Sequence, residues 1–163
     1  MDAALRFLDI LRVLTRHDVE FILVGGVAAI LEGAPVSTFD LDIVVPAASE
    51  NHPRLLAAFR ELNARYLDPA GRHIVPEESH LASLRIHRLI TDHGPLDVMQ
   101  SIGNGLTYAD LVAETREYDV GGTTVRALKL EKIILSKEQA NRDKDKRALH
   151  TLRRTLDLKG TSE

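Results

Sequence analysis

The sequence predicts a single α/β domain, and three observations support this prediction. The chain has 163 residues, 44% of them hydrophobic and 28% charged, which is enough for one domain with a substantial core. Short apolar runs of strand length alternate with segments whose apolar residues repeat at helical spacing. No internal repeat, low-complexity tract or linker divides the chain. We therefore treat residues 1–163 as one domain, with a core at about 19–126 and C-terminal helices at 128–158.

The first 45 residues predict two helices and two strands. At the start of the chain, polar residues recur every three or four positions in a narrow stripe and apolar residues fill the rest. Each predicted strand is a short apolar run; Gly25-Gly26 ends the first and Pro46 ends the second. The predicted elements, in order, are a mostly buried helix at 3–16, a strand at 19–24, a short helix at 27–33 closed by Gly33, and a strand at 39–45.

The rest of the chain predicts two hairpins and a helical end. Residues 63–81 are polar and rich in Pro and Gly, so we expect an irregular loop or lid there. Asp92-His93-Gly94 and Gly121-Gly122 are turn signals between strand-like segments. The expected elements are a helix at 53–62, strands at 83–91 and 95–100, a short helix at 107–114, strands at 116–120 and 123–128, and two helices or one bent helix across 128–140 and 143–158.

Composition and charge narrow the possible classes of protein. The chain has no cysteine, so it has no disulfide framework or thiolate chemistry; this fits a reducing compartment, and we expect a cytoplasmic protein. Charges throughout the first 18 residues argue against a signal peptide or membrane span. Residues 1–128 contain 11 Lys/Arg and 18 Asp/Glu, whereas residues 129–159 contain 10 and 5. The basic segment is either a solvated helical face or a footprint for phosphates.

Three Asp residues inside apolar runs are the clearest chemical signal. A carboxylate removed from water is costly unless it is paired or binds a cation, and two neighbouring carboxylates repel. Positions two apart on a strand face the same side, so Asp40 and Asp42 should share a face opposite the buried Leu41 and Ile43. Asp97, in GPLDVM, would join them if its strand lies beside 39–45. Such a cluster suits Mg²⁺ and phosphoryl chemistry; the alternative is a solvated face of an edge strand.

A glycine pair and two hydroxyls lie close to these carboxylates in the sequence. Gly25-Gly26 falls between a strand and a helix, where bare backbone N–H groups can approach an anion. Ser37 and Thr38 add hydroxyl donors. The combination fits a nucleoside triphosphate with Mg²⁺, although a tight turn explains the glycines equally well. The sequence contains no P-loop, no G-x-S-x-G elbow and no zinc-ligand spacing.

The order of these motifs resembles that of the nucleotidyltransferase superfamily. The matching stretches are GGVA at 25–28, STFDLD at 37–42, LDVM at 96–99 and SKEQANRDKDKRAL at 136–149. The pattern is most similar to the small bacterial AbiEii-like group, many of whose members are toxins of toxin–antitoxin pairs. One position departs from the group: Val36 stands where Arg is usual. The departure concerns nucleotide preference more than fold.

The resemblance implies a topology and a metal site. The topology is a small mixed or antiparallel sheet, with helices packed on it and a helical C-terminal segment. Asp40 and Asp42 would hold Mg²⁺ (or Mn²⁺). Asp97 would complete a second metal site and help to deprotonate the acceptor hydroxyl. Electrostatic stabilisation and positioning dominate such transfers.

The resemblance also implies which residues bind the nucleotide. Gly25, Gly26 and Thr38, with Ser37 beside it, would line the triphosphate. Lys137 would reach the phosphates. A further residue, Asp145, would orient Lys137 or contact the nucleotide. The alternative is that Lys137 is an ordinary solvent-facing lysine and that Asp143 and Asp145 simply favour the start of a charged helix.

The expected function is therefore transfer of a nucleoside monophosphate from an NTP such as ATP. The acceptor would be the 3′ end of tRNA or a protein hydroxyl, and the chain would be the toxin of a pair with a cognate antitoxin. The basic residues 129–159 suit an RNA backbone, whereas the overall acidity favours a protein acceptor or a small RNA footprint. Two alternatives stay open: a non-catalytic docking module of the same fold, and a small-molecule nucleotidyltransferase of the antibiotic-modifying sort.

Overall fold

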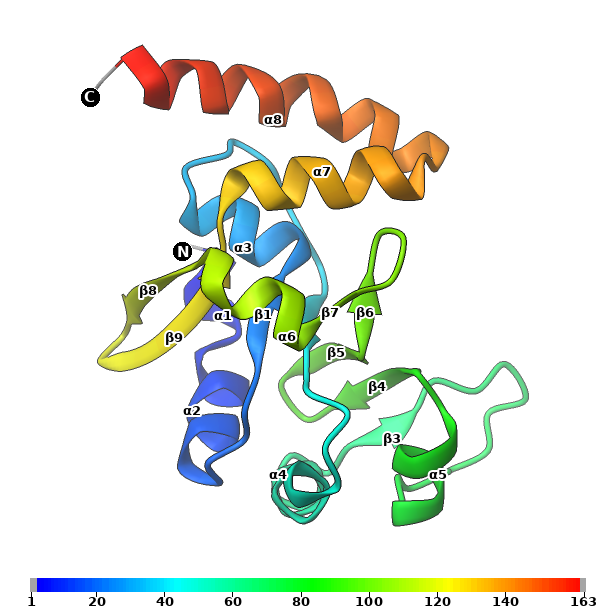
Figure 1. The fold of residues 1–163 in the computed structure, drawn as a ribbon. Helices are drawn as coiled ribbons and strands as arrows, with labels where there is room; N and C mark the ends of the chain where they lie inside the picture. Colours follow the sequence, from blue (N-terminus) through cyan, green and yellow to red (C-terminus); the bar gives the residue numbers. More distant parts are fainter. Residues whose placement is uncertain (1–2, 162–163) are drawn as a thin grey trace.

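A mixed seven-stranded sheet forms the centre of the computed structural model, which describes residues 3–161 (Figure 1). The strand order is β3-β4-β5-β2-β1-β9-β8, with β2–β5 and β1–β9 parallel and the other neighbours antiparallel. A separate two-stranded sheet pairs β6 with β7. The strands are β1 Ile22–Val24, β2 Leu41–Val44, β3 Arg65–Tyr66, β4 Ile86–Thr91, β5 Gly94–Met99, β6 Ser101–Ile102, β7 Leu106–Thr107, β8 Thr115–Val120 and β9 Thr123–Leu128.

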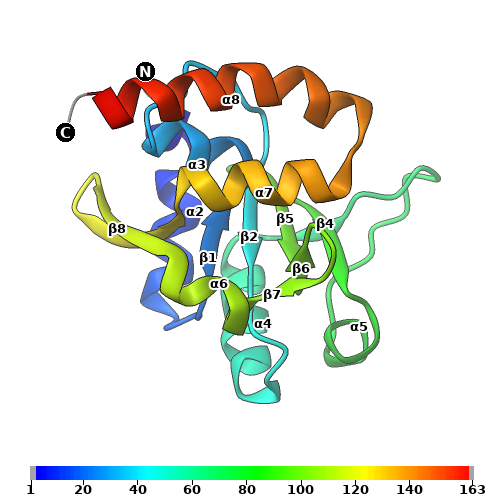
Figure 2. The same cartoon turned by 45° about the horizontal axis from the view of Figure 1, so that its top comes forward.

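Helices flank this sheet, and α8 lies across the outer side of α7 (Figure 2). The α-helices are α1 Ala3–Arg6, α2 Leu8–Arg16, α3 Gly25–Leu31, α4 His52–Glu61, α5 Glu78–Ser83, α6 Tyr108–Leu111, α7 Leu130–Ala140 and α8 Asp143–Thr161. Two 3₁₀ turns, Ser49–Asn51 and Val112–Glu114, complete the regular elements. Within residues 3–161, no helix is long and apolar enough to cross a lipid bilayer.

The core holds the central strands in place. Every residue of β1 and β2 is buried except Asp42, which is partly buried. Phe7 and Phe59 are among the largest side chains buried around them. Because each fully buried large apolar side chain stabilises the fold by about 1.5–3 kcal/mol, the position of Asp42 is fixed by its neighbours Leu41 and Ile43, both fully buried.

Most of the predicted elements are present. The α/β class, the mixed sheet, both hairpins, the helix after Pro53 and the helical C-terminal segment are confirmed. Residues 128–161 form two helices rather than one bent helix, because the chain turns at Asn141, whose φ is +52°. Leu41 and Ile43 are buried, as expected from the alternation along β2.

Several boundaries differ from the prediction. The helix expected at 3–16 is interrupted at the buried Phe7, and the strands expected at 19–24 and 39–45 are shorter. The short helix begins at Gly25 rather than at residue 27. The prediction of an irregular 63–81 is partly wrong, because β3 pairs with β4 and α5 begins at Glu78. Pairing with a distant strand leaves no local sequence signal. The short strands β6 and β7, which pair with each other across residues 103–105, were not expected either.

Candidate active site

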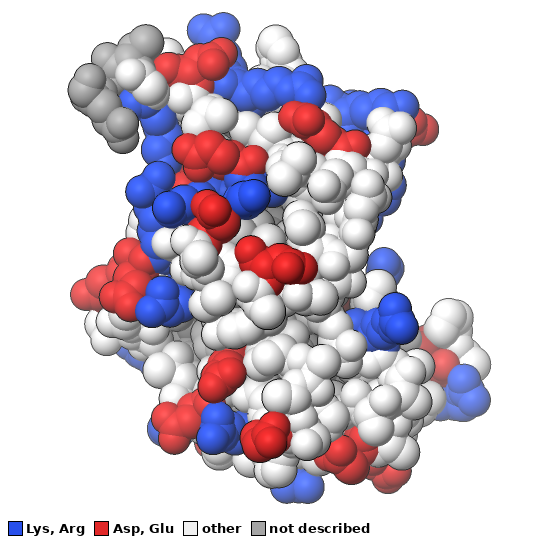
Figure 3. Space-filling model, in the orientation of Figure 1, with Lys and Arg blue, Asp and Glu red and all other residues white. Residues whose placement is uncertain are grey.

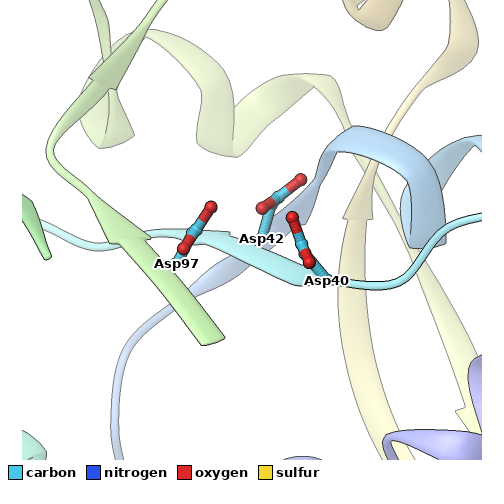
Figure 4. A group of neighbouring side chains, drawn as sticks. All are labelled: Asp40, Asp42 and Asp97. Carbon is cyan, nitrogen blue, oxygen red and sulfur yellow. The ribbon is translucent and has the colours of Figure 1, made fainter. Parts of the chain in front are cut away.

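Two neighbouring parallel strands bring the three predicted carboxylates together. The register of β2 and β5 pairs Asp42 with Asp97, so both side chains leave the sheet on the same face. Asp40 lies in the bend just before β2, outside the strand that was expected to contain it. One carboxylate oxygen from each residue lies within 4.8 Å of those of the other two (Figure 4).

Burial and like charge oppose ionisation of the carboxylates in this cluster. Burial, together with the carboxylates of Asp97 and Asp40, raises the pKa of Asp42 to about 7, against the opposing charges of Lys137 and Lys144. Burial and Asp40 likewise raise the pKa of Asp97. The three carboxylates cannot all ionise easily without a nearby positive charge. Their converging oxygen atoms form a donor set that fits a hard divalent cation such as Mg²⁺ or Mn²⁺.

Neither position of the Gly25-Gly26 pair has room for a side chain, because neighbouring atoms lie too close. Gly25 has φ +65°, and a Cβ atom there would overlap the carboxylate oxygen Oδ2 of Asp42. At Gly26, a Cβ atom would lie 2.6 Å from the Cβ of Thr38. The backbone of the pair therefore approaches the carboxylate cluster more closely than any residue with a side chain would allow.

Hydrogen bonds of Thr38 shape the segment just before Asp40. The Thr38 hydroxyl donates to the backbone carbonyl of Asp40 at 3.1 Å and accepts from the Asp40 N–H at 3.4 Å, which fixes the bend that presents Asp40. Ser37 is exposed. Val36 is partly buried against the core. The two hydroxyl residues are therefore adjacent to the carboxylate cluster, with Thr38 engaged by the backbone.

A cavity of about 300 Å³ opens over the carboxylate cluster. Its walls come from β4, β5, the start of α3, the α7 helix and the start of α8. The structure places most of the predicted site residues on this cavity; Ser37 and Thr38 are not among the described residues that line it. The predicted residues lining it are Gly25, Gly26, Asp40, Asp42, Asp97, Lys137 and Asp145.

Asp145 joins α7 to the start of α8. Its side chain is fully buried and accepts from Arg142 Nε at 2.6 Å and Nη2 at 3.2 Å, and from Lys137 Nζ at 3.5 Å. Burial opposes ionisation, but the hydrogen bonds from Arg142 and the charge of Lys137 lower the pKa of Asp145 overall. Asp145 is therefore buried and paired, whereas Asp143, two residues earlier, is almost fully exposed.

Sequence reasoning missed residues on the opposite wall. Arg88 pairs directly with Asp97 across β4–β5, and Ile86 pairs with Met99. All four of these side chains line the cavity. The sequence did contain a signal for the pairing of Arg88 with Asp97. If the hairpin turn consists of Asp92 and His93, then residue 91 pairs with residue 94 and residue 88 pairs with residue 97.

A family model described as aminoglycoside-2''-adenylyltransferase matches residues 6–152. The chain belongs to the aminoglycoside-2''-adenylyltransferase family. It is therefore a nucleotidyltransferase, as the motif order predicted. The narrower AbiEii-like assignment has no support in this match. No curated protein matches the chain.

Solved structures show the same fold. The antibiotic-resistance factor ANT(2'')-Ia has a TM-score of 0.60 and 17% identity, over 96% of this chain and 86% of its own. The lincosamide antibiotic adenylyltransferase LnuA, solved with lincomycin bound, has a TM-score of 0.60 and 15% identity, over 91% and 94%. TM1012 from Thermotoga maritima has a TM-score of 0.53 and 20% identity, over 93% and 90%.

Proposed function

We propose that this adenylyltransferase-family protein transfers a nucleoside monophosphate from ATP or another NTP to a hydroxyl of a small molecule, with release of pyrophosphate. The observation that carries the proposal is the cluster of Asp40, Asp42 and Asp97, which lies in one cavity with Gly25-Gly26 and Lys137. In such a transfer, the acceptor oxygen forms a bond to the α-phosphorus. The bond between that phosphorus and the bridging α–β oxygen breaks, and pyrophosphate leaves with the electron pair.

Asp40, Asp42 and Asp97 would hold Mg²⁺ or Mn²⁺, which when bound would offset the charge of the triphosphate and of the departing pyrophosphate. Asp97 lies on the wall opposite α7 and is placed to accept the proton of the acceptor hydroxyl.

The residues on the α3 and α7 side would bind the triphosphate. Gly25 and Gly26 leave the backbone bare beside the cluster, so their N–H groups are available to phosphate oxygens. Lys137 supplies a positive charge whose direction is set by its ion pair with Asp145. Thr38 would act indirectly, by holding the bend that carries Asp40.

A small-molecule acceptor is supported by the family match, since the family is described by its action on an aminoglycoside. ANT(2'')-Ia, solved in complex with adenylyl-2''-tobramycin, and LnuA, solved with lincomycin bound, share the fold. The basic residues on α8, visible along the top of Figure 3, are all that favours an RNA acceptor. The comparisons give no support to a tRNA or protein acceptor, an antitoxin or a toxin role.

The test offers Mg²⁺, each α-labelled NTP and a panel of hydroxyl-bearing antibiotics, with tRNA and lysate protein in parallel. Transfer of label to a small molecule is expected, and Asp42→Asn should abolish it. Asp157→Asn removes a carboxylate from the exposed face of α8 and is the matched control. Label on tRNA or protein would contradict the small-molecule acceptor. Triphosphate binding without transfer to anything would favour the non-catalytic docking module.

A further inference from the structure

The wall of the cavity beside Asp97 is apolar and carries a cation. Ile86 and Met99 face each other across β4–β5, next to the pair formed by Arg88 and Asp97. The Ile86 side chain is about half exposed, at 54%, within a protein whose other strand residues are mostly covered. Leu67, which is 62% exposed, adjoins this wall because its N–H bonds to the carbonyl of Arg88 at 2.9 Å. Exposed apolar side chains at the mouth of a cavity suit contact with an apolar ligand.

The carboxylates on the cavity are already engaged. Asp40, Asp42 and Asp97 form the proposed cation site. Asp145 is fully buried and paired with Arg142 and Lys137. No carboxylate among the described residues that line the cavity is therefore left to bind an amino group of an acceptor.

Two cationic side chains on the cavity, in contrast to its carboxylates, are not engaged. Among the described residues 3–161, neither the guanidinium of Arg88 nor the ammonium of Lys144 has a hydrogen-bond or ion-pair partner. Both act electrostatically on Asp97 from within the cavity. A ligand that approaches Asp97 therefore meets a guanidinium, an ammonium and an apolar surface.

We infer that the acceptor is an uncharged or anionic hydroxyl compound with an apolar portion, and that Arg88 and Ile86 select it against polycations. This inference rests on the proposed function and names the substrate class of the same site. The apolar portion packs on Ile86 and Met99, while the hydroxyl faces Asp97. A polycationic aminoglycoside finds no free carboxylate there and is repelled by Arg88.

The test measures equilibrium binding to the full chain loaded with Mg²⁺ and a non-hydrolysable NTP analogue. The probes are hexyl glucuronide (anionic), hexyl glucoside (neutral) and tobramycin (polycationic). Hexyl glucuronide should bind at least about tenfold more tightly than tobramycin, with hexyl glucoside between them. Arg88→Glu should weaken glucuronide binding by about tenfold, which is about 1.4 kcal/mol, and should strengthen tobramycin binding.

Arg85→Glu is the matched control, because Arg85 is exposed just before β4 but lines a different hollow. It changes the net charge equally and should leave the order of the probes unaltered. The inference would be overturned if tobramycin were the tightest-binding probe of the unaltered protein, or if all three probes bound equally or undetectably. Equal effects of the two variants on binding would also overturn it. Loss of NTP-analogue binding in the unaltered protein would instead defeat the proposed function, so the two failures are distinguishable.

Discussion

The surroundings of Asp42 oppose the ionisation of its carboxyl group. Its neighbours in β1 and β2 are buried, and two further carboxylates approach it. Its pKa is about 7 in the folded protein against an ordinary 3.8. Ionised Asp42 therefore destabilises the cation-free fold. The destabilisation is absent below about pH 4, grows as the pH rises from 4 to 7, and is complete above 7.

We therefore expect Asp42→Asn to stabilise the cation-free protein. In EDTA above pH 7, the variant should be more stable than the unaltered chain by up to about 4 kcal/mol, since one pKa unit corresponds to about 1.4 kcal/mol. The difference should disappear near pH 3, where Asp42 is largely protonated in both states. Urea unfolding at both pH values measures it. Nucleotidyl transfer should fall at least about 100-fold.

Asp157→Asn controls for the general effect of removing a negative charge, because Asp157 is exposed on α8. It should show neither the gain in stability nor the loss of transfer. Added Mg²⁺ should raise the stability of the unaltered chain more at pH 8 than at pH 5.5, because protons compete for Asp42. An Asp42→Asn variant as unstable in EDTA at pH 8 as the unaltered chain would contradict this account.

Substitution of Gly25 tests whether transfer depends on the close approach of the backbone to Asp42, as distinct from backbone strain alone. Gly25→Ala places a Cβ in the left-handed region and against Asp42 Oδ2. We expect a loss of about 1–2 kcal/mol in unfolding free energy from the strain, and a fall of at least about 100-fold in transfer because the carboxylate must move. Gly122→Ala is the matched control: Gly122 has φ +89° and no atom near its Cβ position. Similar losses of transfer in both variants would refute the steric argument.

At the scale of elements, the connection between α7 and α8 decides where Lys137 points. Periodicity predicted two helices or one bent helix here, and the spacing of Lys137 and Asp145 is visible in the sequence. The sequence does not show that the chain reverses at Asn141 and returns Asp145 against Lys137. The same limit applies to β3, whose partner β4 is distant in the chain. Local pattern therefore identified elements, and pairing between them had to come from the structure.

Asp145→Asn should loosen this connection. The change leaves Lys137 and Arg142 without their shared carboxylate, and a loss of about 2 kcal/mol in unfolding free energy is expected, less than for fully buried partners because Arg142 is 55% exposed. The dissociation constant for an NTP analogue should rise several-fold, since Lys137 loses its orientation. Calorimetric titration and urea unfolding measure these quantities. Asp143→Asn, in the same turn of α8 but exposed, should change neither by a comparable amount.

At the scale of the whole molecule, one buried carboxylate links parts of the chain that are far apart in sequence. Glu32 follows α3 and has a fully buried side chain. It accepts from the N–H of Leu130 at 2.8 Å and from the hydroxyl of Tyr118, and it forms ion pairs with Arg116 at 3.3 Å and Lys159 at 3.4 Å. It thereby connects α3 to β8, to the start of α7 and to the end of α8.

Glu32→Gln should destabilise the whole fold by about 3 kcal/mol at neutral pH, because it leaves Arg116 and Lys159 without their anion. Burial opposes ionisation, but the hydrogen bonds of Tyr118 and Leu130 and the two cations lower the pKa of Glu32. Its contribution is therefore full above the unfolded pKa near 4.5 and is lost as the pH falls through the lowered folded value. Urea unfolding between pH 3 and 7 tests this. Glu117→Gln, an exposed carboxylate on β8 paired with Arg126, should have little effect.

The sequence by itself determined the α/β class, both hairpins, the C-terminal helices and the identity of the three carboxylates. These follow from local periodicity, from turn residues and from the cost of placing Asp42 and Asp97 in apolar strands. The tertiary structure alone decided that β2 lies beside β5 in the register pairing Asp42 with Asp97, and that Asp145 is buried. It also placed Arg88 and Ile86 on the cavity. The placement of β2 beside β5 and its register depend on contacts between residues distant in the chain, and no local pattern encodes these contacts.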